Sequence, residues 1–335
     1  MVRYVVLVSL CLPFATTQDL TDEHCDTCRI KRATRSQLAD IKVRLYTGED
    51  LDTYTEVVVG DATELLDKMN LSKPTVLFVH GWFGTIVREL YYNEVTLAYL
   101  EQKTHNVLYF NWETISTTDY LSAGMSVPGV GYTLAKVLNE MVAAGLNSSS
   151  LHLVGHSFGA QALGYVGRSV NFTVPRIVGL DPAGLLFYTY MPHLNSSDAD
   201  YVEVIHTGMG SILSSSLQLG DVDFYPNGGE YANQGCTVLP AICGHARACL
   251  LYAEFIRNKT ALIGRACDSY SNFKDGSCDS NGTVVMGYAT PNTASGKYYL
   301  QTNSFSPYGR GEEGATYESI IESLLGNVAS VLSII

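Results

Sequence analysis

Five apolar runs without polar alternation constrain the fold of this chain more than any other feature. Runs of this kind, rich in β-branched residues, are typical of strands buried on both faces of a sheet. Two intervening stretches, 130–146 and 160–170, have the periodicity of helices. Strands that alternate with helices predict an α/β domain with a mostly parallel sheet. The runs are TVLFVH (75–80), NVLYFNW (106–112), LHLVG (151–155), RIVGL (176–180) and YVEVIHT (201–207).

The composition fits one globular domain and argues against polyanionic partners. The chain has 335 residues, of which 46% are hydrophobic, so it can bury a large core. No internal repeat, linker or break in composition precedes position 310, and we expect a single domain over 41–310. Because the net charge is −12 and no basic stripe is visible, nucleic acid and heparin-type polymers are not expected partners.

The N-terminal region predicts a secreted protein. Residues 1–17 place Arg3 before an apolar run and then small residues, which is the order of a signal peptide; a buried N-terminal strand is the alternative. The N-x-[ST] sequons and the cysteines agree with an oxidising secretory route. An extension over 18–40 carries Cys25 and Cys28, and the number of cysteines left after the signal peptide is odd. The sequons are at Asn70, Asn147, Asn171, Asn195, Asn258 and Asn281.

The last segment, 311–335, predicts an amphipathic helical tail. Its apolar residues share one face of a helix, which either docks on its own domain or binds a membrane or a partner. The segment is short for a helix that spans a bilayer. The residues of the apolar face are Ile321, Leu324, Leu325, Val328, Val331, Leu332 and Ile335.

The stretch LHLVGHSFGAQALGY carries the strongest chemical signal in the chain. Its Gly155, Ser157 and Gly159 form a G-x-S-x-G motif between a strand-like and a helix-like run, which is the context of a nucleophile elbow. Such a turn projects the serine hydroxyl above the sheet, and the amino end of the next helix favours developing negative charge. The motif predicts that Ser157 is a nucleophile, with a chance occurrence of the motif as the alternative.

A serine nucleophile requires a histidine and an acid, which follow it in the order acid, histidine in elbow enzymes. Asp181 directly follows the buried run RIVGL, so its position favours it over three acids in polar, loop-like sequence. The residues alone leave the histidine open among three candidates, of which His245 lies beside two cysteines that could restrain its loop. The competing acids are Asp198, Asp200 and Asp221, and the histidines are His193, His206 and His245.

Acyl transfer also requires two N–H donors for the tetrahedral oxyanion. Phe158, the residue after the nucleophile, supplies the first. The run FVHGWFGT (78–85) ends a buried strand with His80-Gly81-Trp82, so we expect the Trp82 N–H to supply the second. Taken without the elbow, Trp82 is better interpreted as a core aromatic residue.

Five motifs in a fixed order resemble the pancreatic lipase family of secreted α/β-hydrolases. The similarity extends from about Ile41 to Tyr308. It implies an α/β-hydrolase fold, in which helices flank a mostly parallel sheet. We expect no cofactor and, because the family's calcium loop is altered at Asn195, no metal. The resemblance also implies that Ser157, Asp181 and His245 form a triad, with the amides of Trp82 and Phe158 as the oxyanion hole. The motifs are FVHGWFGT, LVGHSFGA, GLDPAG, DFYPNGG and CGHARA.

The same resemblance implies two disulfides, Cys236–Cys243 closing a lid and Cys267–Cys278 elsewhere. The lid is then only TVLPAI, and the second covering segment, 208–222, is also short. Among relatives this combination accompanies phospholipase A1 activity, as in insect and venom enzymes, and also occurs in insect neutral lipases. We therefore expect a phospholipase A1 that acts on lipid esters at a membrane or lipid interface. The alternatives are a triacylglycerol lipase, a galactolipase and a non-catalytic yolk-type lipid-binding protein.

The chain departs from the family pattern in three places. The region after the catalytic motifs does not match a C-terminal β-sandwich, so a platform for colipase is not expected. In 193–201, which corresponds to the family's calcium loop, Asn195 stands in place of an acidic ligand. Cys249 follows His245 by one turn, and a bond from Cys25 or Cys28 would brace that helix.

Overall fold

A single large sheet organises the molecule. The computed structural model describes residues 31–82, 91–188 and 190–319. Within these residues the sheet has 11 strands in the order β10-β9-β11-β8-β7-β6-β5-β3-β4-β1-β2. The strands are β1 (Lys42–Tyr46), β2 (Tyr54–Val58), β3 (Thr75–Val79), β4 (Asn106–Asn111), β5 (Leu151–His156), β6 (Arg176–Leu180), β7 (Val202–Ile205), β8 (Val222–Pro226), β9 (Ile263–Ala266), β10 (Thr283–Val285) and β11 (Gly296–Leu300).

The centre of the sheet is parallel and its two edges are antiparallel. Strands β4, β3, β5, β6 and β7 are neighbours that all pair in parallel, and they are the five strands expected from the apolar runs. Strands β8 and β11 continue the parallel part, while β1 with β2 and β9 with β10 form the antiparallel edges. Because parallel strands end at one edge, the segments that follow β5 and β6 lie close together.

The helices confirm the alternating pattern, with one boundary misplaced. The helix expected over 160–170 is α7 (Phe158–Gly167), whereas the one expected over 130–146 is α6 (Tyr120–Ala143) and starts earlier. The Asp119 side chain caps α6 by accepting from the Ser122 amide, and the helix continues through Pro128. The other helices are α2 (Arg35–Ala39), α4 (Asn93–Gln102), α5 (Glu113–Ser116), α8 (Pro240–Arg257) and α9 (Tyr270–Lys274), with 3-10 turns at Val59–Lys68, Ser148–Ser150, Ser196–Asp198, Tyr231–Asn233 and Glu312–Ala315.

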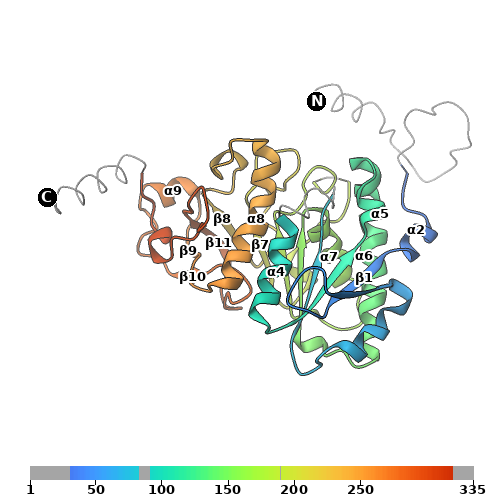
Figure 1. The fold of residues 1–335 in the computed structure, drawn as a ribbon. Coiled ribbons are helices and arrows are strands. Elements are labelled where there is room, and N and C mark those ends of the chain that lie inside the picture. The colour runs from blue at the N-terminus through green and yellow to red at the C-terminus, as the bar shows by residue number, and fades with distance from the viewer. Residues whose placement is uncertain (1–30, 83–90, 189, 320–335) are drawn as a thin grey trace, which may run out of the picture.

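Both faces of the sheet are buried, which explains why its strands lack polar alternation. Along β3, Leu77 and Val79 pack into the core under α6 and α7, while Val76 and Phe78 pack into the core under α4 and α8. Figure 1 shows α4 and α8 side by side on their face of the sheet. The two layers fix the sheet from both sides, so the loops at its carboxyl edge start from rigid positions.

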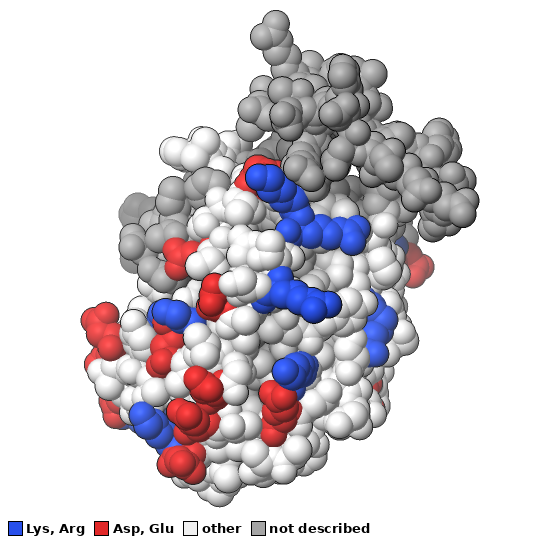
Figure 2. All heavy atoms as spheres, turned by 90° about the vertical axis from the view of Figure 1, so that its right-hand side faces the viewer, with Lys and Arg blue, Asp and Glu red and all other residues white. Residues whose placement is uncertain are grey.

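Charges on the surface are mixed in sign. The face drawn in Figure 2 carries Lys and Arg next to Asp and Glu, without a broad basic area. Over the described ranges, no helix combines the length and the apolar character that crossing a bilayer requires.

Two disulfides are present as the family resemblance implies, and one cysteine prediction is wrong. Cys236 bonds to Cys243 and Cys267 bonds to Cys278. Cys249 is a free thiol buried in the core under α8, so the suggested bond to Cys25 or Cys28 is not formed. Its apolar surroundings account for it, because a free cysteine packs as a small hydrophobic residue. Cys25 and Cys28 themselves, the signal peptide over 1–17 and the tail from 320 lie outside the described residues.

The asparagines of the six sequons differ in solvent exposure. Asn195 is half-buried, and its side-chain oxygen accepts from the Ser197 amide to cap a 3-10 turn. The other five asparagines are exposed, as attachment of a glycan requires. Glycosylation of any of the six remains a prediction.

Candidate active site

The turn between β5 and α7 holds Ser157 in a strained conformation. Ser157 has φ 56° and ψ −121°, in the positive-φ region that residues other than glycine rarely adopt. A Cβ at Gly159 would lie 2.1 Å from the carbonyl oxygen of Val79, and one at Gly155 would lie 2.7 Å from the backbone of Gly159. The two glycines therefore let neighbouring backbones approach closely enough to form the predicted elbow.

Asp181 follows β6 directly and has all of its acceptor positions in use. One carboxylate oxygen accepts from the amides of Thr207 and Gly208, each at 2.9 Å. The other accepts from the Ser214 hydroxyl and from His245 Nδ1, each at 2.5 Å. Burial alone would raise the pKa of Asp181, but the hydrogen bond and charge of His245, followed by Ser214 and Thr207, hold its pKa below the ordinary value. A buried, ionised carboxylate thus orients the imidazole.

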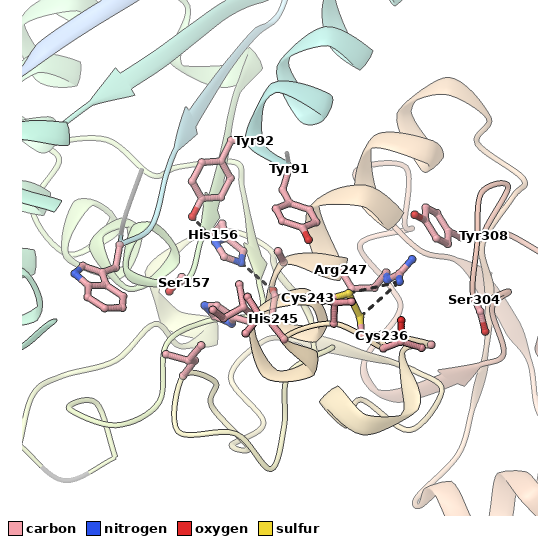
Figure 3. A pocket seen from close by; sticks show the side chains of 18 of the residues that line it. Tyr91, Tyr92, His156, Ser157, Cys236, Cys243, His245, Arg247, Ser304 and Tyr308 are labelled. Carbon is pink, nitrogen blue, oxygen red and sulfur yellow. Dashed lines mark hydrogen bonds between the residues drawn. A yellow bond between two sulfur atoms is a disulfide. The ribbon is translucent and has the colours of Figure 1, made fainter. Parts of the chain in front are cut away.

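The contact with Asp181 fixes the tautomer of His245. A carboxylate accepts hydrogen bonds only, so Nδ1 carries the proton and Nε2 has a free lone pair. His245 lies in the second turn of α8, and both it and Ser157 line one cavity of about 690 Å³ (Figure 3). Among the described residues no hydrogen bond joins the Ser157 hydroxyl to His245, and contacts of this kind often tighten only when substrate binds.

The loop after β3 lies against Ser157. A Cβ on Gly81 would lie 2.7 Å from the Ser157 Cβ and 3.0 Å from the His156 carbonyl oxygen. Trp82 comes next, lines the same cavity and is fixed by a 2.9 Å bond from its Nε1 to the Thr118 carbonyl. The structure therefore brings the Trp82 segment and the start of α7, where Phe158 lies, next to Ser157.

A buried chain of hydrogen bonds, which sequence reasoning missed, joins this loop to α8. The Tyr92 hydroxyl accepts from the Gly81 amide at 3.2 Å and bonds to His156 Nδ1 at 2.9 Å, and His156 Nε2 bonds to the His245 carbonyl oxygen at 2.9 Å. Burial, together with the nearby His245, lowers the pKa of His156 to about 3, so the ring is neutral. Its Nε2–H therefore donates to the carbonyl, while its Nδ1 accepts from Tyr92. The chain connects the backbones of Gly81 and His245.

Ser214 was also missed as a site residue, although it belongs to the predicted covering segment 208–222. Its hydroxyl donates to Asp181 and lies 3.0 Å from His245 Nδ1. The segment thus holds the acid, and its Leu213 lines the cavity. Its position, 33 residues after Asp181, is one that no local pattern could reveal.

The competing candidates from the sequence lie in other arrangements. Asp198 accepts two bonds from Arg168, and Asp221 accepts from the Val202 amide. His206 is buried and pairs with Asp223 at 2.7 Å. The third acid and third histidine, Asp200 and His193, are also absent from the lining of the cavity. In the segment that corresponds to a calcium loop, the Asp198 carboxylate is thus occupied by Arg168.

The Cys236–Cys243 loop forms one wall of the cavity. Val238 and Leu239, near its tip, are 75% and 66% exposed, and Ile242 is partly exposed. Leu239 has φ 45°, a left-handed conformation that is uncommon for leucine, and Pro240 then starts α8. Because His245 lies only two residues beyond Cys243, the loop and the candidate base belong to one continuous element.

Two known lipases are similar to this chain in sequence. Lipase member H-A of Xenopus laevis is 31% identical over 247 residues, which cover 71% of this chain and 53% of that protein. Pancreatic triacylglycerol lipase of Sus scrofa is 30% identical over 313 residues, which cover 81% of this chain and 67% of that protein. The chain therefore spans about half the length of the lipase member H relatives that it matches.

Solved structures are more distant. A sugar hydrolase from Lactococcus lactis aligns with a TM-score of 0.39 at 13% identity, over 65% of this chain and 94% of that one, which is too remote to carry an argument. The family model described as Lipase, by contrast, matches residues 8–308. Because that match covers most of the chain and the pancreatic enzyme is among its relatives, the chain belongs to the lipase family, as its motifs predict.

Proposed function

We propose that this protein is a secreted hydrolase of lipid acyl esters and, within that class, a phospholipase A1. His245 Nε2 takes the proton of the Ser157 hydroxyl, which attacks the ester carbonyl. The Trp82 and Phe158 amides bind the oxyanion, and Asp181 stabilises the imidazolium that forms. His245 then gives its proton to the leaving alcohol, and water repeats the sequence on the acyl-enzyme.

The observation that carries the proposal is the Asp181–His245 pair beside a cavity that Ser157 lines. The cavity is walled mainly by aromatic and aliphatic side chains, which suits an acyl chain. An ionised acid, a histidine with a free Nε2 and a serine at an elbow are the parts that acyl transfer requires.

Exposed apolar side chains support action at a lipid surface. Val238 and Leu239 on the disulfide loop and Phe305, at 77% exposure, all belong to segments that line the cavity. Large apolar residues gathered around a cavity often mark a surface that contacts a membrane or another apolar phase. We infer that these residues contact the lipid aggregate that supplies substrate. The two disulfides and the exposed sequons support secretion.

The size of the covering loop favours phospholipids. Only six residues separate Cys236 from Cys243, so little chain stands over the mouth of the cavity, and a bulky polar head group has room outside it. The second candidate is hydrolysis of triacylglycerol, which the apolar lining and the name of the pancreatic relative favour. A galactolipase would use the same groups, and a non-catalytic lipid carrier would use none of them.

The test is Ser157→Ala, assayed beside the wild type on phosphatidylcholine and triolein. Loss of the nucleophile is expected to lower kcat by about 10⁴-fold or more, with an unchanged unfolding midpoint. A fluorophosphonate probe is expected to label the wild type and not the variant. Hydrolysis retained by Ser157→Ala would overturn the proposed mechanism, and failure of the wild type to react would indicate the lipid carrier. Preference for triolein would replace phospholipase A1 with the second candidate.

A further inference from the structure

Arg247 is a buried charge for which the described part of the chain provides no counterion. It lies on α8 two residues after His245, and only 5% of its surface is exposed. Its Nε and Nη1 atoms are buried with no hydrogen-bond partner in the described parts of the chain. Its Nη2 atom reaches only the two disulfide sulfurs, at 3.6 Å from Cys236 and 3.9 Å from Cys243. Because sulfur is a weak acceptor, most of the hydrogen-bonding capacity of this guanidinium is unused.

Other arginines that the structure buries in part have good acceptors: some are paired with acids, and Arg265 donates to backbone carbonyls. Arg168 bonds to Asp198, and Arg176 pairs with Glu203. A buried charge is ordinarily neutralised by such a partner, because desolvation without compensation is costly. Arg247 instead stacks its guanidinium 4.4 Å from the centre of the Tyr308 ring. The fold therefore leaves unused donors at this one position of α8.

These donors lie at the wall of the proposed active-site cavity. Arg247 and Tyr308 line it together with Ser157 and His245, and the lining residues that the structure describes include no Asp or Glu. Figure 3 shows Ser157, His245, the disulfide, Arg247 and Tyr308 in succession across the cavity. Arg247 thus lies on the far side of His245 from the nucleophile, in a protein whose net charge of −12 would otherwise repel anions.

The position relative to His245 identifies which part of a substrate would meet the charge. In the proposed reaction His245 protonates the leaving oxygen, so the leaving alcohol lies on the His245 side of Ser157. Resting on that proposed function, we propose that Arg247 is an anion subsite that binds the phosphodiester of a phospholipid's leaving alcohol. A planar guanidinium is well matched to two phosphate oxygens.

The covering loop has to shift for the phosphodiester to reach Arg247. The contacts of the loop with the guanidinium are the two long ones to sulfur, and its tip residues, Val238 and Leu239, are mostly exposed. Phosphate oxygens would replace weak acceptors with strong ones. The leaving alcohol of a triacylglycerol has no such group, so Arg247 gives a preference for phospholipid at the same site.

The experiment compares two substrates with the same acyl chains, dihexanoylphosphatidylcholine and 1,2-dihexanoylglycerol. For Arg247→Met, the ratio of kcat/KM for the phospholipid to that for the diacylglycerol is expected to fall roughly 10- to 100-fold, as loss of a charge-assisted hydrogen bond implies. Arg247→Lys keeps the positive charge but lacks the planar pair of N–H donors. Its substrate ratio is expected to lie between those of the wild type and Arg247→Met. The matched control is Arg257→Met, which removes the same charge from the same helix, where it pairs with Glu94 and Glu101 outside the cavity. Its ratio is expected to stay at the wild-type value.

All rates are expressed per site titrated with a fluorophosphonate, so that misfolded protein does not count. If Arg247→Met keeps the wild-type ratio of the two kcat/KM values, the subsite is refuted, but the proposed phospholipase A1 activity is not. If the wild type cleaves only the diacylglycerol, the proposed phospholipase A1 activity and the subsite are both refuted, while the proposed ester hydrolysis is supported. If Arg247→Met gives no titratable sites, Arg247→Lys decides, because a wild-type ratio there means that the planar fork does not bind the phosphodiester.

Discussion

Tyr92→Phe tests whether the buried hydrogen-bond chain holds the site together. The change removes one oxygen that accepts from the Gly81 amide at 3.2 Å and bonds to His156 Nδ1 at 2.9 Å. Burial raises the pKa of Tyr92 well above its ordinary value, so the phenol keeps the proton that it donates. The phenylalanine ring fits the same space, so the substitution removes the contacts without opening a large cavity.

The magnitude follows from the two groups that lose their partner. The Gly81 N–H and His156 Nδ1 are both buried, and each unsatisfied group costs about 1–3 kcal/mol, so the free energy of unfolding is expected to fall by about 2–6 kcal/mol. Complete loss of one oxyanion donor costs about 10²–10³-fold in kcat. Because Tyr92→Phe loosens the loop that carries the proposed Trp82 donor without removing it, we expect a smaller effect, about tenfold in kcat.

The assay measures kcat on a soluble short-chain ester per fluorophosphonate-titrated site, together with urea unfolding. The matched control is Tyr99→Phe, which removes a buried hydroxyl from α4, where it bonds to the Tyr252 hydroxyl at 2.8 Å away from the cavity lining. The control loses a single contact, so it is expected to lower stability by about 1–3 kcal/mol and to keep wild-type kcat. Equal kcat values for Tyr92→Phe and Tyr99→Phe would refute the positioning role of the chain.

Two further predictions concern the acid and the neutral histidine. Ser214→Ala removes the donor 2.5 Å from Asp181, which is expected to lower kcat about tenfold with little change in KM; an unchanged kcat would mean that the other three donors hold the acid alone. The pKa of His156 is about 3 in the folded state and about 6.5 in the unfolded state, so below pH 6.5 the unfolded state binds the extra proton. The contribution of His156 to stability is therefore complete above pH 6.5 and is lost as pH falls toward 3, by about 1.4 kcal/mol per pH unit. Between pH 7 and pH 5 the loss accrues over the roughly 1.5 pH units below 6.5, so urea unfolding is expected to show a pH dependence smaller by about 2 kcal/mol in His156→Gln than in the wild type. Equal dependences would contradict the assigned pKa.

The centre of the fold could be predicted from the sequence because its strands are buried on both sides. Runs such as TVLFVH show no polar face and match β3, β4, β5, β6 and β7. The edge strands were not identified because they are short and partly exposed, as in β2, where every residue is half-buried or exposed. The start of α6 was placed late because its first turns contain glycine, serine and Pro128, which disfavour a helix on local grounds.

Site residues could be predicted only where a local sequence pattern marks them. Ser157 and Asp181 follow buried strands, and the structure places both at the same edge of the sheet. The residues alone left the histidine open, and the family resemblance decided for His245. Tyr92 and Ser214 act through partners from distant segments, so no spacing reveals them. Arg247 could have been noticed as a lone cation within the otherwise apolar stretch ARACLLYA of a helix.

The anchoring of α8 at two levels bears on how this scaffold could be altered. Its first turn carries Pro240 and Cys243 of the disulfide loop, and the next turn is tied by the His245 carbonyl to the neutral ring of His156. The bond to His156 therefore keeps a movement of the loop from displacing His245. Loops of other lengths could therefore be grafted between Cys236 and Cys243 to change the substrate range, while His245 keeps its position relative to Asp181 and Ser157.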